Sequence, residues 1–214
     1  MVVGGAVTDC SGVLLQPRWV LTAAHCMYDG AGNLVDLEDV YVWDYRNGTS
    51  DFAFPDARAR WGFDPTANSD PEHDIALLHL GDGLDQWSHD DMDMSWAGDS
   101  DLNDVGPNFH NLGFPDYLTS SCNSNAYGLY HSADNDLTLK GSKKLKWKGD
   151  ASEGNSGGPL YYCPQGDPEV CGEGEPGRVV AVLAGLSSDE DRIWGARVSY
   201  YADSIADLID TWPW

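Results

Sequence analysis

Short apolar runs separated by turn residues limit most strongly what this chain can fold into. They recur at residues 13–15, 19–21, 40–43, 75–78, 112–114 and 179–183. Runs of this length, bounded by Gly, Pro, Asn and Asp, are typical of strands in all-β proteins. Residues 199–209 differ, because their apolar side chains fall near helical spacing behind Ser199, a candidate N-cap. We therefore expect an all-β fold that ends in one short helix.

The charge of the chain narrows the range of partners. It has 35 Asp and Glu residues against 12 Lys and Arg, a formal net charge of -23. Nucleic acids are bound through clustered basic residues, so we expect no nucleic-acid partner. A peptide or basic substrate is compatible with this charge, and so is a role in solubility alone. No apolar run approaches the roughly 20 residues that span a membrane, so we expect no membrane partner.

The most acidic stretch, residues 81–104, is interpreted as a solvated connector between two halves of the chain. Three of its residues have the odd-position spacing of an EF-hand loop: Asp99, Asp101 and Asn103. However, Asp104 stands where that loop needs Gly, and His110 stands where it needs a bidentate Glu. We therefore reject an EF-hand and assign no metal site, while calcium binding of another kind in the connector stays open.

The chain has five cysteines, and four of them are placed to close hairpins. Cys10 and Cys26 flank a strand–turn–strand pattern, and Cys163 and Cys171 flank a second turn. Two such disulfides predict an oxidising compartment, so we expect a secreted or periplasmic protein. Cys122 is left over; it is either a buried free thiol or a replacement for one partner of the Cys163 pair.

Ser156 is the candidate nucleophile. It lies in Gly-Asn-Ser-Gly-Gly-Pro at 154–159. A Ser hydroxyl needs a base to activate it and donors for the developing oxyanion. Without a side chain, Gly154 allows the backbone N–H groups of Gly154 and Ser156 to point into one pocket, which predicts an oxyanion hole.

His25 is the candidate base, and Asp74 is the carboxylate expected behind it. His25 follows two alanines and precedes Cys26, so the proposed disulfide would hold the imidazole on a stapled hairpin. Asp74 stands directly before four apolar residues, which allows it to lie partly buried at the edge of a barrel, facing His25. A general base needs such positioning, and a carboxylate fixes its tautomer.

Three segments together resemble the chymotrypsin-like (trypsin-like) serine peptidases. They are Trp-Val-Leu-Thr-Ala-Ala-His-Cys at 19–26, Asp-Ile-Ala-Leu-Leu at 74–78, and Gly-Asn-Ser-Gly-Gly-Pro-Leu at 154–160. The order His, Asp, Ser matches this family and differs from that of subtilisins and α/β-hydrolases. Cys-Ser-Gly at 10–12 and the C-terminal helix extend the resemblance over most of the chain.

The resemblance implies two antiparallel six-stranded β-barrels with the triad in the cleft between them. The N-terminal barrel would span residues 1–95 and carry His25 and Asp74, and residues 96–214 would form the C-terminal barrel with Ser156 and the helix. It also implies a monomeric serine endopeptidase that hydrolyses protein or peptide substrates through an acyl-enzyme, with no cofactor and no metal. The alternatives are a catalytically silent binding protein on the same fold and an HtrA-like quality-control protease.

One departure from the family pattern concerns activation. Asn155 stands where animal digestive and clotting members carry an Asp that pairs with a newly cut N-terminal ammonium group. An amide cannot form that ion pair, so the chain resembles bacterial relatives such as the glutamyl endopeptidases. Only four residues separate Gly5 from Cys10. We therefore interpret Val-Val-Gly-Gly at 2–5 as part of a strand, and the first strand of the barrel is in doubt.

A second departure concerns the specificity pocket. Asp150 lies six residues before Ser156, where trypsin-like members read a P1 Arg or Lys. A buried carboxylate there would favour a bidentate guanidinium, and Glu153 would add negative charge. The pocket wall is expected at Ala184, Gly185 and Leu186. Leu183 or its neighbours stand where glutamyl endopeptidases place a His, which disfavours a Glu preference.

Overall fold

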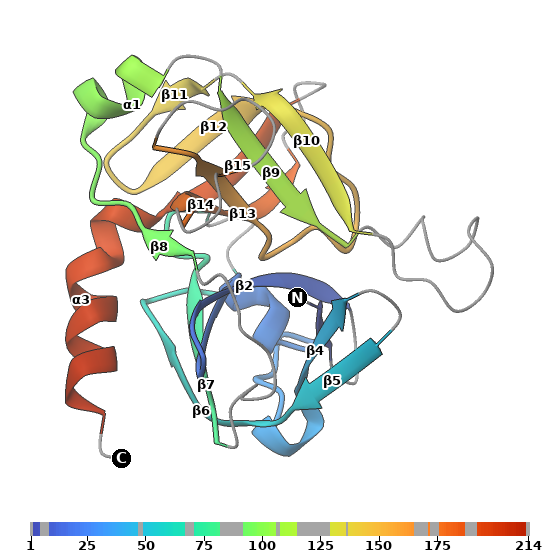
Figure 1. The fold of residues 1–214 in the computed structure, drawn as a ribbon. Helices are drawn as coiled ribbons and strands as arrows, with labels where there is room; N and C mark the ends of the chain where they lie inside the picture. Colours follow the sequence, from blue (N-terminus) through green and yellow to red (C-terminus); the bar gives the residue numbers. More distant parts are fainter. Residues whose placement is uncertain are drawn as a thin grey trace.

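The computed structural model describes residues 2–4, 9–46, 49–66, 71–81, 92–105, 108–114, 129–135, 137–164, 171, 176–186 and 192–212. Its strands form two curled sheets stacked one on the other, and a C-terminal helix runs along the side of the molecule (Figure 1). This arrangement confirms the predicted all-β class. The Cys122 thiol and the acidic residues 82–91 lie outside the described residues.

The first sheet has seven described strands in the order β5-β4-β1-β2-β3-β7-β6. They are β1 (Val2–Gly4), β2 (Cys10–Gln16), β3 (Trp19–Thr22), β4 (Tyr41–Arg46), β5 (Thr49–Ala53), β6 (Pro55–Arg60) and β7 (Ala76–Leu80). The short 3-10 helices η1 (Ala24–Met27) and η2 (Leu37–Asp39) follow β3 and precede β4. Residues 2–4 form a strand, as expected, and β1 pairs with both β2 and β4. The first strand of the barrel, which the sequence left in doubt, is therefore present.

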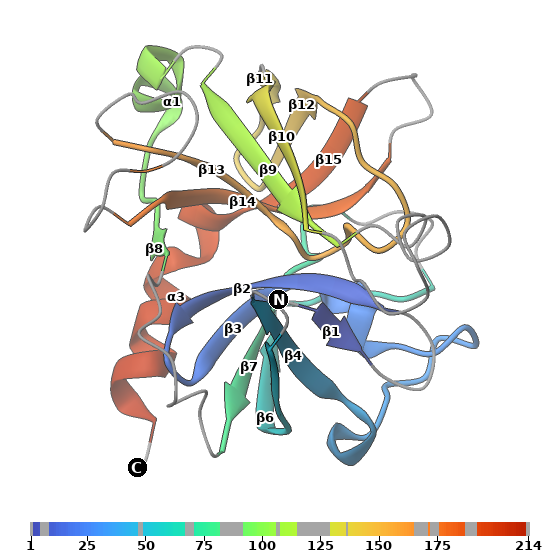
Figure 2. The ribbon, with the colours of Figure 1, turned by 45° about the vertical axis from the view of Figure 1, so that its right-hand side comes forward.

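The second sheet has eight described strands, seven of them in the order β10-β9-β13-β14-β15-β12-β11 (Figure 2). They are β8 (Asp93–Met94), β9 (Phe109–Gly113), β10 (Tyr130–Asn135), β11 (Leu137–Lys140), β12 (Lys144–Lys148), β13 (Pro159–Tyr162), β14 (Arg178–Leu186) and β15 (Arg192–Arg197). The eighth, β8, pairs in parallel with β14 and so already belongs to the second sheet. The domain boundary at residue 95 stays a prediction.

Both faces of the central strands are buried, which explains their continuous apolar runs. In β3 and β7, Leu21 lies opposite Leu77 and Val20 lies opposite Leu78. Leu21 and Leu77 pack in a core cluster that includes residues of the second barrel and of the C-terminal helix, whereas Val20 and Leu78 pack inside the first barrel. Successive side chains of a strand point to opposite faces. Such strands therefore show no polar–apolar alternation.

In the described part of the chain, two α-helices flank the sheets. The C-terminal helix α3 (Val198–Thr211) begins one residue before the predicted segment and ends two residues after it. Its N-cap is Arg197, so the prediction of Ser199 as N-cap was wrong; the Ser199 hydroxyl instead accepts a hydrogen bond from Arg197 Nε. In the connector, α1 (Asp99–Val105) winds the EF-hand-like acidic spacing into a helix. No helix in the described ranges is long and apolar enough to cross a membrane.

Both predicted disulfides are present. Cys10 of β2 is bonded to Cys26 of η1, across a separation of 16 residues. Cys163 is bonded to Cys171, across a separation of 8 residues. The first disulfide ties the end of the β2–β3 hairpin to the turn that carries His25, so it fixes the backbone on the C-terminal side of the imidazole.

We expect the Cys10–Cys26 disulfide to stabilise the fold. Replacing both cysteines with Ala should lower the free energy of unfolding by about 3 kcal/mol, because the reduced chain gains the conformational freedom of the opened loop. Urea denaturation with and without the substitutions measures this change. Replacing Cys163 and Cys171 is the matched comparison and should cost slightly less, since the loop is shorter. A loss below about 1 kcal/mol for Cys10–Cys26 contradicts the expectation.

Candidate active site

The structure brings His25 and Asp74 together beside two neighbouring strands of the first sheet, β3 and β7. His25 lies in η1, and Asp74 lies two residues before β7. The imidazole Nδ1 lies 2.6 Å from Asp74 Oδ2, and the His25 backbone N–H donates to Asp74 Oδ1 at 2.8 Å. Asp74 is only 3% exposed, and both of its carboxylate oxygens form hydrogen bonds with His25. This pairing holds the imidazole with Nδ1 protonated and leaves Nε2 as the basic nitrogen.

The environment of His25 raises the pKa of its imidazole above the ordinary value of 6.5. Burial lowers this pKa, because an imidazolium is poorly solvated away from water. The negative charge of Asp74 and its hydrogen bond raise the pKa, and together they outweigh burial. The pair is therefore built to stabilise a proton on His25, which a general base needs after it has accepted one.

Ser156 lies on a loop whose backbone is shaped by two glycines. Gly154 has φ +89° and Gly157 has φ +84°, in the region that favours glycine. The Gly157 N–H donates to Leu183 O at 2.8 Å, which ties the loop to β14. A Cβ on Gly157 would overlap the carbonyl oxygen of Ser11 and the hydroxyl of Thr22, so only glycine permits this close approach. The loop of the second barrel therefore packs directly on the β2–β3 hairpin.

The same packing places Ser156 near the His25 turn. The Ser11 N–H of β2 donates to Ser156 O at 2.6 Å. The Cβ position of Gly157 also lies 3.0 Å from the backbone nitrogen of Ala23, two residues before His25. Among the described residues, no hydrogen bond joins Ser156 to His25. Hydrogen bonds between catalytic groups are often long before substrate binds. The lack of a Ser156–His25 hydrogen bond among the described residues is therefore compatible with a nucleophile and its base.

The two predicted oxyanion donors are available. Within the described part of the chain, neither the Gly154 amide nor the Ser156 amide donates a hydrogen bond. The backbone of Asn155, which lies between these two amides, is held by two hydrogen bonds. The Asn155 N–H donates to Ser152 O at 3.1 Å, and the Gly158 N–H donates to Asn155 O at 2.9 Å. Fixed, unoccupied backbone N–H groups are what an oxyanion hole supplies.

The residues predicted for the specificity pocket differ in exposure. Asp150 is exposed, whereas a buried carboxylate was expected; the Tyr130 hydroxyl donates to its Oδ2 at 3.3 Å. Glu153 is also exposed. Leu183 is 1% exposed and belongs to the core of the second barrel. Its side chain therefore packs inward and supplies no polar group to read an acidic substrate.

The predicted wall residues form the end of β14. Ala184 and Gly185 are half-buried, and Leu186 is 59% exposed. A Cβ on Gly185 would meet nothing within 4 Å, so the space beside it is open. Gly185 and Leu186 pair with β15 in the described sheet. On the other side of β14, the described backbone hydrogen bonds to β13 and to the residues just before it reach as far as Leu183. This end of β14 thus has an edge to which an extended chain can add.

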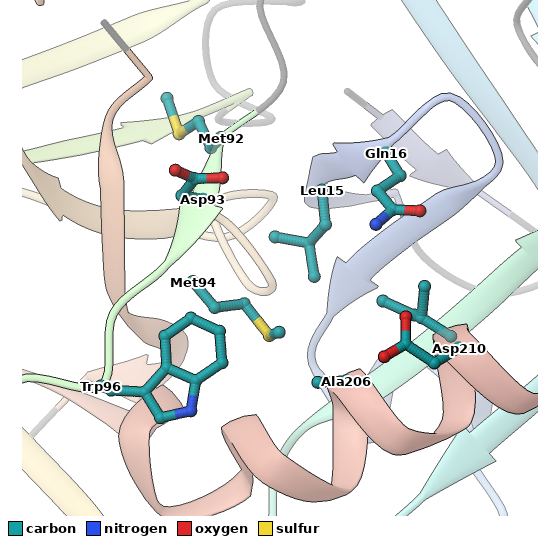
Figure 3. A pocket seen from close by; sticks show the side chains of 9 residues that line it. Leu15, Gln16, Met92, Asp93, Met94, Trp96, Ala206 and Asp210 are labelled. Carbon is teal, nitrogen blue, oxygen red and sulfur yellow. The ribbon is translucent and has the colours of Figure 1, made fainter.

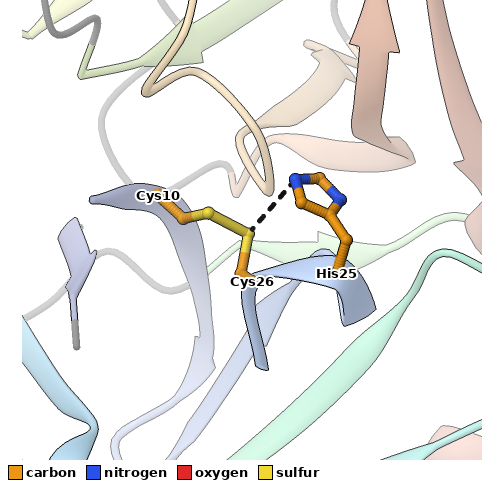
Figure 4. A group of neighbouring side chains, drawn as sticks. All are labelled: Cys10, His25 and Cys26. Carbon is orange, nitrogen blue, oxygen red and sulfur yellow. Dashed lines mark hydrogen bonds between the residues drawn. A yellow bond between two sulfur atoms is a disulfide. The ribbon is translucent and has the colours of Figure 1, made fainter. Parts of the chain in front are cut away.

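The sulfurs of Cys10 and Cys26 lie beside the imidazole (Figure 4). The distance between His25 Nε2 and Cys26 Sγ is 3.7 Å. His and two Cys are common metal ligands, but thiolates are the ligands that bind metals. Because both sulfurs are joined in a disulfide, the group does not fit a metal site. The arrangement fits a general base, His25, whose neighbour Cys26 is held in place by a disulfide.

A separate cleft of about 160 Å³ lies between β2, the connector and α3 (Figure 3). Its apolar lining comes mainly from Leu15, Met92, Met94 and Trp96, and Asp93 and Asp210 stand at its rim. None of the residues predicted for catalysis lines it. The candidate active site and this cleft therefore have no residue in common.

Comparison with known proteins agrees with this geometry. The family model described as Trypsin matches residues 1–188. The chain belongs to the trypsin family. It is 30% identical over 140 residues to Kallikrein-1E2 of Equus caballus, a match covering 64% of this chain and 48% of the relative. It is 36% identical over 84 residues to Glandular kallikrein-10 of Rattus norvegicus, covering 36% of this chain and 32% of the relative. The chain thus spans less than half the length of these relatives.

A solved structure shows the same fold. Glu endopeptidase in complex with MPD superposes with a TM-score of 0.72, covering 97% of this chain and 88% of the other, at 13% sequence identity. At that identity the likeness concerns the fold, and the trypsin-family assignment rests on the family model. The predicted chymotrypsin-like architecture is confirmed by this neighbour.

Sequence reasoning missed the residues that fasten the Ser156 loop. Ser11 was predicted only as part of a matching Cys-Ser-Gly, and Gly113 only as part of the apolar run at 112–114. A Cβ on Gly113 would lie 2.7 Å from the side-chain nitrogen of Asn155, so β9 also approaches the loop closely. The signal available in the sequence was the placement of small residues at Ser11, Gly12 and Gly113, in strands otherwise built from larger side chains.

The His25–Asp74 pair predicts a titration that can be observed directly. By NMR, the His25 imidazole should titrate with a pKa above 6.5. In Asp74→Asn, the charge is gone while burial remains, so the pKa should fall below 6.5. Asp56→Asn is the control, because Asp56 contacts a different imidazole, that of His79. A His25 titration that is the same in Asp74→Asn and in the unmodified protein contradicts the assignment.

Proposed function

We propose that this trypsin-family chain is a serine endopeptidase that hydrolyses peptide bonds through an acyl-enzyme. The observation that carries the proposal is the buried Asp74 carboxylate, with both oxygens bound by His25, beside a loop that presents Ser156. A structural His–Asp pair has no need of a neighbouring Ser whose own N–H and that of Gly154 donate no hydrogen bond within the described residues. A catalytic triad requires this combination.

The proposed steps use only these groups. His25 Nε2 takes the proton from the Ser156 hydroxyl as its oxygen attacks the substrate carbonyl carbon. The resulting oxyanion accepts hydrogen bonds from the Gly154 and Ser156 amides, and Asp74 stabilises the imidazolium. His25 then donates its proton to the leaving amine. Water, deprotonated by His25, attacks the acyl-enzyme and releases the acid, and the proton returns to Ser156. No cofactor or metal enters these steps.

For the P1 side chain we propose Arg or Lys. Asp150 has an exposed carboxylate that Tyr130 holds by one hydrogen bond, which leaves oxygen lone pairs to accept from a cation. Glu153 adds a second exposed carboxylate in the same segment, and the burial of Leu183 leaves that position without a polar reader for an acidic P1 residue. The exposure of Asp150 weakens its attraction relative to a buried carboxylate, so the preference should be moderate.

We also propose that the substrate is a protein or peptide bound in extended form along the free edge of β14 at Ala184–Leu186. Backbone pairing with a sheet edge is a general way of holding an extended peptide. The two disulfides support an oxidising compartment, so we place the protein outside the cytosol, as a secreted or periplasmic monomer.

The triad is tested by labelling and by kinetics. A fluorophosphonate probe should label the unmodified protein and fail to label Ser156→Ala. His25→Ala should lower kcat for a peptide amide by roughly four orders of magnitude or more, since the hydroxyl loses its base. Ser95→Ala, which removes a buried hydroxyl in the connector, is the control and should keep labelling. Absence of labelling in the unmodified protein would favour a catalytically silent binding protein, and a loss under tenfold in His25→Ala would exclude His25 as the base.

The P1 proposal is tested with peptides that differ only at P1. The unmodified protein should cleave after Arg and Lys faster than after Leu or Glu. Asp150→Lys should abolish cleavage after Arg while leaving the circular dichroism spectrum unchanged, because the side chain is exposed. Asp210→Lys makes the same charge change on α3 and should preserve the preference. Equal cleavage after Arg and Leu by the unmodified protein refutes a basic P1 preference.

A further inference from the structure

The hydroxyl of Ser11 joins three segments that are far apart in the sequence. It accepts a hydrogen bond from the Phe114 N–H at 2.8 Å and donates one to Gly154 O at 2.8 Å. Ser11 is 1% exposed, so neither bond competes with bulk water. A single Ser hydroxyl of the first barrel therefore connects the end of β9 to the loop that carries Ser156.

The backbone of Ser11 reinforces this connection. Its N–H donates to Ser156 O at 2.6 Å, and its carbonyl oxygen accepts from the Thr22 hydroxyl at 2.7 Å. Through its hydroxyl and its N–H, Ser11 thus binds the loop at both Gly154 and Ser156. These are the two residues whose amides are the proposed oxyanion donors.

The loop has no ionic anchor of its own among the described residues. Asn155 is fully buried and neutral, and neither its side-chain oxygen nor its nitrogen has a hydrogen-bond partner in the described structure. Gly154, with φ +89°, stands in a backbone conformation that glycine enters and leaves easily. The hydrogen bond from Ser11 to the Gly154 carbonyl oxygen restrains the peptide group on the C-terminal side of Gly154.

We propose that Ser11 is a positioning residue of the oxyanion hole. Its hydroxyl holds the Gly154 carbonyl, and by restraining the peptide group that follows Gly154 it limits the rotations through which the Gly154 amide could turn away from the developing oxyanion. The ordering is built into the fold and needs no ion pair at Asn155. The inference deepens the proposed peptidase function and rests on it.

The first test compares hydroxyl-free and hydroxyl-bearing variants on a peptide amide. Ser11→Ala and Ser11→Gly should lower kcat about tenfold or more with KM within about twofold, because an oxyanion donor acts in the transition state. Ser11→Thr keeps the hydroxyl and should retain most of the kcat. The Ki of a peptide aldehyde, which forms an oxyanion at the same place, should rise by the same factor as kcat falls. Either hydroxyl-free variant suffices if the other fails to fold.

Ser95→Ala is the matched control, since it also removes a buried hydroxyl that accepts from a backbone amide. It should change neither kcat nor the aldehyde Ki. Unchanged kcat and Ki in the hydroxyl-free variants, a rise confined to KM, or an equal loss in Ser95→Ala would each overturn the role of Ser11. Inactivity of the unmodified protein toward all peptide amides would refute the proposed function, and the inference would fall with it.

Discussion

The hydrogen bond from the Ser11 amide to the Ser156 carbonyl oxygen is the contact on which the candidate site depends. It joins the first barrel, which carries the base, to the second barrel, which carries the nucleophile. A contact this short between two backbones is possible only because Gly157, next to Ser156, has no side chain to keep them apart. The relative position of Ser156 and His25 is therefore set by main-chain atoms, which are stiffer than side chains, and the geometry does not rely on long flexible residues.

The strands β3 and β7 pack in two core clusters, one on each face, and this packing also fixes the site. The face of β3 that carries Leu21 packs on a cluster shared with the second barrel and α3, while the other face fills the first barrel. His25 lies three residues after the end of β3, and Asp74 lies two residues before β7, the neighbour of β3. The ladder between these two strands sets the separation of the two side chains. The hydrogen bonds between His25 and Asp74 then add electrostatic stabilisation to a spacing that packing has already defined.

Local patterns predicted much of this architecture, because the information lay in neighbouring residues. The apolar runs located strands in both sheets, and the turn-flanking cysteines predicted both disulfides. Asp74 before an apolar run was expected to be partly buried, and it is buried. Six strands were expected in each barrel, and the described sheets have seven and eight. A two-residue strand such as β8 has no periodicity that a sequence could reveal, and it pairs with β14.

What the sequence could not reveal depends on contacts between distant segments. Asp150 is exposed, and its hydrogen-bond partner Tyr130 in β10 lies 20 residues away, so no local pattern encodes its surroundings. The side chain of Leu183 faces inward because of the register of β14 with β15. Helix α3 starts at Val198 because Arg197 is still paired in β15. The N-cap is therefore Arg197 and not Ser199, where it was expected. Ser11 looked like an ordinary strand residue, since its partners lie 103 and 143 residues away.

The position of α3 has a consequence for the time at which the site can assemble. The Tyr201 hydroxyl of this helix donates to the carbonyl oxygen of Glu72, two residues before Asp74, and Ile205 packs in the cluster that covers Leu21 and Leu77. A ribosome makes the segment with His25 and Asp74 well before it makes these covering residues. Until α3 has emerged, the first barrel leaves that apolar face open and the Asp74 loop lacks one of its ties. A nascent chain should therefore complete its catalytic apparatus only after synthesis has passed the helix.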